Sequence, residues 1–111
     1  MLHPAFGTCP GHANWTRDFS GAAGLFGVIF HPCSDEHIRA FVDALHHFGI
    51  GVSWGGYESL AIPFDPAQVH VLRPWPPGID TGSGLGVRLS IGLEDPGDLI
   101  ADLDQALNAA S

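Results

Sequence analysis

Apolar side chains recur every three or four residues from about residue 35 to residue 48, which is the spacing of an amphipathic helix. Ser34 precedes this stretch as a good N-cap residue, and Gly49 follows it as the expected stop. The pattern therefore predicts a helix. Its buried face carries Ile38, Phe41, Val42, Leu45 and Phe48.

A second helix is predicted to begin after Asp95, which is a good capping residue. Pro96 suits the first helical position, and Asp98 places a carboxylate in the first turn, where the helix dipole favours negative charge. The apolar side chains of its buried face are Leu99, Ile100, Leu103, Ala106 and Leu107.

Shorter apolar or alternating stretches predict strands. These stretches are residues 25–30, 50–54, 69–72 and 86–93. The run 59–62, which precedes Pro63, fits either a short extended piece or one helical turn. Together with the two helices, these strands predict an α+β fold, with a mainly antiparallel four-stranded sheet and two helices packed on one face.

The first twenty residues show no hydrophobic period and are rich in Pro, Gly, His and Trp. We therefore expect residues 1–20 to form an extended arm with turns, and residues 21–111 to form the α+β domain. At 111 residues, with 45% hydrophobic and 14% charged side chains, the chain is long enough for one packed domain. No apolar run approaches the length of a membrane span, and no secretory signal is visible, so we expect a cytoplasmic protein without a membrane partner.

The net charge of −8 argues against nucleic acid as a partner, because phosphate binding needs clustered cations. All four cationic side chains are arginines, so the chain contains no lysine. Cys9 and Cys33 are expected to be free thiols. Histidines lie near them in the sequence, at His3, His12, His31 and His37. Their order does not match zinc-ligand spacing, and we expect no metal site.

The segment Ser53–Leu60 combines two adjacent glycines with two aromatic rings, two hydroxyls and a carboxylate. Such a mixture suits a loop that holds a small ligand against backbone amides, although a tight turn explains the glycines equally well. Trp54 is more often a core residue than part of a ligand site. Ser53 has no His–Asp partner at a recognisable spacing, so a serine hydrolase is not supported.

Arg88 lies inside an apolar strand, between Val87 and Leu89. A buried guanidinium needs an anion or hydrogen-bond acceptors, and its fork can hold a carboxylate through two parallel hydrogen bonds. The alternatives are an internal salt bridge to Glu58 or Glu94, or a side chain that faces water.

Three motifs, in order, carry a resemblance to a known family. They are Gly51–Leu60, Arg88–Asp95 and Asp98–Leu103, and the upstream stretch His12–Phe30 is also similar. Together they resemble the C-terminal small domain of the Cys/Met-metabolism family of pyridoxal-phosphate enzymes of fold type I. The tryptophan before Gly-Gly is most similar to that of the cystathionine β-lyases.

The resemblance implies specific roles. The arginine matching Arg88 holds the α-carboxylate of a small sulfur amino-acid substrate, the serine matching Ser53 lies beside it, and the residue matching Trp54 shapes the pocket. The implied reaction breaks the Cβ–S bond of cystathionine and yields homocysteine, pyruvate and ammonia, with pyridoxal phosphate as the cofactor.

The absence of lysine departs from the family pattern, because these enzymes hold pyridoxal phosphate as a Schiff base with lysine. We therefore expect no catalytic residue in this chain, no cofactor bound to it alone and no lyase activity by itself. Its expected partners are a separate cofactor domain or another copy of itself, in a homo-oligomer. The alternative is a free-standing non-catalytic module that binds a partner chain or a small carboxylate.

Overall fold

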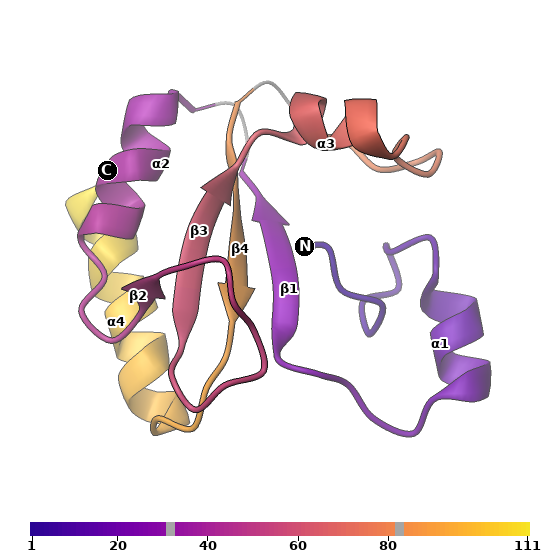
Figure 1. Ribbon diagram of the computed structural model, residues 1–111, viewed down its shortest axis with the longest axis horizontal. Coiled ribbons are helices and arrows are strands. Elements are labelled where there is room, and N and C mark those ends of the chain that lie inside the picture. Colours follow the sequence, from indigo (N-terminus) through magenta and orange to yellow (C-terminus); the bar gives the residue numbers. More distant parts are fainter. Residues whose placement is uncertain (31–32, 82–83) are drawn as a thin grey trace.

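A four-stranded sheet in the order β1-β4-β3-β2 organises the chain (Figure 1). The computed structural model describes residues 1–30, 33–81 and 84–111. The strands are β1 Leu25–Ile29, β2 Gly49–Ile50, β3 Leu60–Phe64 and β4 Gly86–Ser90. β4 pairs antiparallel with β1 and β3, whereas β2 runs parallel to β3. The predicted α+β fold is confirmed, but the sheet is mixed because of this one short parallel strand.

Helices α2 (Asp35–Asp43) and α4 (Pro96–Ala109) lie together on one side of the sheet, as Figure 1 shows. Their apolar faces and the buried side chains of β3 and β4 form the core. The core consists of Ile38, Phe41, Val42, Leu45, Phe48, Ala61, Val87, Leu89, Leu99 and Ala106. Within the second predicted helix, Ile100 and Leu107 are exposed instead.

Both predicted helix starts are confirmed by their caps. The Ser34 side chain accepts a hydrogen bond from the His37 amide, and the Asp95 carboxylate accepts one from the Gly97 amide. α2 ends at Asp43, however, and not near residue 48 as predicted. Leu45 and Phe48 remain buried beyond its end, so the apolar pattern was a correct guide to burial but not to helix length.

The early end of α2 is held by Asp102 on α4. One carboxylate oxygen of Asp102 accepts from the His46 amide at 2.9 Å, and the other accepts from the His47 amide at 2.7 Å. The Gln105 side chain donates a further hydrogen bond at 2.9 Å. Burial by itself raises the pKa of Asp102, which is only 3% exposed, but these donors outweigh it and leave the pKa below its ordinary value.

Two segments differ in type from the prediction. Residues 69–72 belong to helix α3 (Pro66–Leu72), not to a strand, because Asp65 caps it through the Ala67 amide and Pro66 occupies the first turn. The predicted strand 50–54 is reduced to β2, which ends at Ile50. Of the run 59–62, residues 60–62 adopt the extended alternative as the start of β3.

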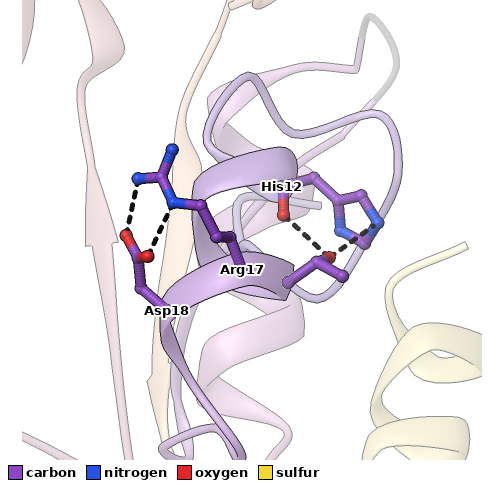
Figure 2. Close-up of polar contacts among 4 residues, drawn as sticks. His12, Arg17 and Asp18 are labelled. Atoms are coloured by element: carbon purple, nitrogen blue, oxygen red, sulfur yellow. Dashed lines mark hydrogen bonds and ion pairs between the residues drawn. The ribbon is translucent and has the colours of Figure 1, made fainter.

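The first twenty residues are not wholly extended, since they contain helix α1 (His12–Asp18). α1 has no buried residue, and the segment is tied to the sheet by a bridge between Leu2 and Gly27 of β1. Figure 2 shows Arg17 and Asp18 paired at the end of α1, with donor–acceptor distances of 2.7 and 2.8 Å. Both side chains are exposed, so this ion pair contributes little stability.

Replacing Asp102 with alanine leaves the amides of His46 and His47 without their acceptor. We expect the free energy of unfolding, measured by urea denaturation at pH 7, to fall by about 2 kcal/mol. Asp104→Ala, on the exposed face of the same helix, is the matched control and should change it by less than about 0.5 kcal/mol. Equal effects of the two substitutions would contradict the proposed role of Asp102.

The same contact predicts a pH dependence that Asp102→Asn, a neutral replacement of similar size, makes visible. Because the folded-state pKa of Asp102 lies below the unfolded value, its ionisation stabilises the fold above about pH 4. This contribution is lost as the pH falls through the folded-state pKa. The stability difference between the original protein and Asp102→Asn should therefore shrink below about pH 4, and a constant difference would contradict the account.

Candidate functional site

Arg88 lies at the centre of β4, opposite Gly27 of β1 and Ile62 of β3. Its neighbours Val87 and Leu89 are buried in the core, so strand alternation directs the arginine to the other face of the sheet. There the Arg88 Nη2 atom donates to the Gly51 carbonyl at 3.2 Å and to the Ser53 carbonyl at 3.0 Å. The loop after β2 is thus fastened to the guanidinium by its backbone.

The charge of Arg88 has no carboxylate partner within the described ranges 1–30, 33–81 and 84–111. Neither Glu58 nor Glu94 forms the salt bridge considered as an alternative. The ion pair found within these ranges joins Arg17 and Asp18 of α1. The Arg88 Nε atom is buried and has no hydrogen-bond partner. A buried donor without a partner is costly, and the unpaired positive charge of the guanidinium suits the site to an anion.

The structure places Ser53 and Trp54 beside Arg88, and these are the three residues to which the resemblance assigns substrate binding. Ser53 contributes its carbonyl, and the Trp54 ring centre lies 5.9 Å from the guanidinium carbon, in cation–π range. Trp54 is 64% exposed, which rules out the alternative of a core residue. Gly55, with φ of 73°, forms the turn that follows, in a conformation that favours glycine.

Three further residues hold this loop, and sequence reasoning gave them no such role. The Ser90 hydroxyl, two residues after Arg88, accepts a hydrogen bond from the Gly55 amide at 3.4 Å. Ser59 is fully buried at the other end of the loop, where Glu94 binds both its amide and its hydroxyl. A serine directly before the apolar run Leu60–Ile62 was the available signal, since a buried hydroxyl needs a partner.

The remaining candidates for chemistry do not converge. Cys9 and Cys33 are both free thiols. Over the part of the chain that the structure describes, no three His, Cys, Asp or Glu side chains are placed to hold a metal ion. His31 lies outside the described residues. No helix among those described is long and apolar enough to cross a membrane.

The sequence pattern of one family matches residues 1–108, and its description is Cys/Met metabolism PLP-dependent enzyme. The chain belongs to this family. A cystathionine beta-lyase of Bordetella avium is 48% identical over 111 residues, which cover all of this chain and 27% of that enzyme. Cystathionine beta-lyase MetC of Escherichia coli strain K12 is 44% identical over 103 residues, which cover 92% of this chain and 26% of MetC.

The fold is also similar to that of a solved enzyme structure. A crystal structure of cystathionine gamma synthase from Xanthomonas oryzae pv. oryzae, in complex with cystathionine, superposes with a TM-score of 0.74 at 31% identity. The superposition covers 97% of this chain and 28% of that one. The chain therefore spans about a quarter of the length of the relatives that it matches.

The residues present do not fit the family's cofactor by themselves. Pyridoxal phosphate is anchored as a Schiff base on lysine, and none of the 111 residues is a lysine. Covalent anchoring therefore requires a lysine from outside these residues. What the present segment does offer is a cationic group at the Arg88 site, with an exposed aromatic ring beside it.

Gly92, in the segment that follows β4, has no side chain, and this allows the backbone of the loop to approach closely. A Cβ atom at Gly92 would meet the Tyr57 carbonyl and lie 2.6 Å from the Ser59 amide nitrogen, and both groups are backbone. We expect Gly92→Ala to destabilise the protein by about 1–3 kcal/mol in urea denaturation. Gly56→Ala, where a Cβ meets nothing within 4 Å, is the control. Equal stability of both variants would show that the approach is not required.

Proposed function

We propose that this chain supplies the substrate-carboxylate part of the active site of a cystathionine β-lyase, a carbon–sulfur lyase of sulfur amino-acid metabolism. In this proposal Arg88 binds the α-carboxylate of the amino acid, Ser53 lies beside that carboxylate, and Trp54 shapes the pocket wall. The family and the names of the relatives support it. The observation that carries it is the guanidinium of Arg88, positioned by the loop and not neutralised by any described acid.

The arrangement suits a carboxylate better than a neutral ligand. The two carbonyls that hold Nη2 orient the guanidinium plane but leave its positive charge in place. An incoming carboxylate therefore gains charge-assisted hydrogen bonds from a guanidinium that no described acid has neutralised. Holding the carboxylate fixes the orientation of the substrate, while the bond-breaking chemistry falls to groups outside these residues.

A graft tests the role of Arg88 directly. The 111 residues replace the matching 27% of the Bordetella avium enzyme, and pyruvate formation from cystathionine is followed. Arg88→Lys should lower kcat/KM by about tenfold to a hundredfold, because lysine cannot reproduce the two-pronged contact. Arg39→Lys, on the exposed face of α2, should leave it unchanged.

Two results would contradict this proposal. One is an Arg88→Lys graft as active as the unaltered graft. The other is pyruvate formation by the 111-residue chain alone, above a no-protein control, when it is supplied with pyridoxal phosphate and cystathionine. The second result would show that the chain needs no lysine from another source.

A second candidate function is a binding module that joins another copy of itself or a separate cofactor domain. An exposed apolar surface on the loop and its surroundings favours such contacts. Its residues are Ile50, Val52, Trp54, Tyr57 and Leu93.

We expect the isolated chain to self-associate through this surface, because each of these apolar side chains is more than 60% exposed and gains from burial. Sedimentation velocity over a range of concentrations should show species larger than 11.7 kDa, and Val52→Ser should shift them toward the monomer. Ala101→Ser, at an exposed position of α4, is the control. A monomer at all concentrations would contradict self-association through this surface.

A further inference from the structure

We propose that Glu94 is a positioning residue for the Arg88 site, acting through Ser59 at the far end of the loop. This inference rests on the proposed function, because it names what keeps that site in shape. Ser59, Gly92 and Glu94 are called the Glu94 clasp below. The side chain of Glu94 binds Ser59, whereas Arg88 binds the carbonyls of Gly51 and Ser53, so the effect of Glu94 must pass through the loop between them.

The clasp satisfies the amide and the hydroxyl of Ser59. The two oxygens of the Glu94 carboxylate accept from the Ser59 amide at 2.8 Å and from the Ser59 hydroxyl at 2.7 Å. The same hydroxyl accepts from the Gly92 amide at 2.8 Å. Ser59 is 0% exposed, so water cannot replace a lost partner without opening the structure.

The loop depends on such fastening because residues 51–59 contain no helix or strand of their own. One segment, residues 88–94, fastens it at several points. Arg88 holds the start of the loop, and the Ser90 hydroxyl holds its middle. Near its end, the Leu93 amide donates to the Tyr57 carbonyl at 2.8 Å.

The loop and the segment from β4 onward are thus joined at both ends, and the clasp forms one of the two junctions. Arg88 forms the other junction, at the opposite end from Glu94. When the Glu94 end opens, the end of the loop loses its buried side-chain anchor. The Ser53 carbonyl then gains freedom, and with it the guanidinium that the carbonyl orients. A carboxylate ligand must in that case order the loop as it binds, which weakens its affinity.

A carboxylate is required at residue 94, and an amide is an imperfect substitute. The Ser59 amide and hydroxyl both donate toward Glu94, so two acceptors are needed. Glutamine offers one acceptor, and its NH₂ group would face the hydroxyl of Ser59. These two donated bonds also hold the pKa of Glu94 below its ordinary value, consistent with a carboxylate that stays charged.

The test uses the active graft and separates KM from kcat. Glu94→Ala should raise the KM for cystathionine about tenfold and leave kcat within about twofold, because the clasp orders the binding residues and not the reacting bond. The KM of the Glu94→Gln graft should lie between those of the unaltered graft and the Glu94→Ala graft, since glutamine restores one acceptor. Glu36→Gln, an exposed glutamate on α2, is the matched control and should change neither constant.

The outcomes distinguish this inference from the proposed function. If Arg88→Lys lowers kcat/KM while Glu94→Ala leaves KM unchanged, the positioning role is wrong and the proposed function stands. If Arg88→Lys has no effect, the proposed function itself is wrong. A fall in kcat at constant KM would mean that Glu94→Ala only reduces the amount of folded enzyme, and would also overturn the positioning role.

A second measurement on the 111-residue chain applies even if the graft is inactive. Amide hydrogen exchange is followed by NMR in the original chain and in Glu94→Ala. Exchange at Gly55, whose amide bonds to Ser90 and not to the clasp, should speed up about tenfold, while exchange at the core residue Val87 should not. Faster exchange confined to Ser59 and Gly92 would overturn the inference.

Discussion

The alternation of side chains along β4 is the constraint on which the rest of the structure depends. Val87 and Leu89 point into the core beneath α2 and α4, and this fixes Arg88 and Ser90 for contacts with the loop. A shift of one residue in the pairing of β4 would bury the guanidinium in an apolar core and expose two aliphatic side chains. Packing in the core therefore determines which groups are available for binding outside it.

Capping residues and apolar spacing predicted those elements whose bounds depend on neighbouring residues. They failed where a residue far away in the sequence determines the bound. Asp95-Pro96 correctly marked the start of α4, and the same Asp-Pro pair at residue 65 marks α3, although the β-branched Val69 and Val71 favoured a strand. The end of α2 depends on Asp102, which lies 56 residues after His46. No local pattern contains that contact, so the helix was predicted too long.

The candidate site shows the same division between local and distant information. Arg88, Ser53 and Trp54 were predicted together because the motifs resemble those of a known family, and the structure does place them together. The alternative of an internal salt bridge from the arginine to Glu58 or Glu94 is not found, because Glu94 binds Ser59 and Arg88 binds loop carbonyls. Pairing among groups far apart in the sequence follows from the register of the strands, which residue types alone do not specify.

The central claim is that Arg88 holds the carboxylate of the substrate, and a crystal structure of the graft with cystathionine bound tests it most directly. The account predicts that the α-carboxylate accepts its hydrogen bonds from the Arg88 guanidinium, at about 2.7–2.9 Å. A carboxylate bound to another cation, with Arg88 still bonded only to the carbonyls of Gly51 and Ser53, would contradict it.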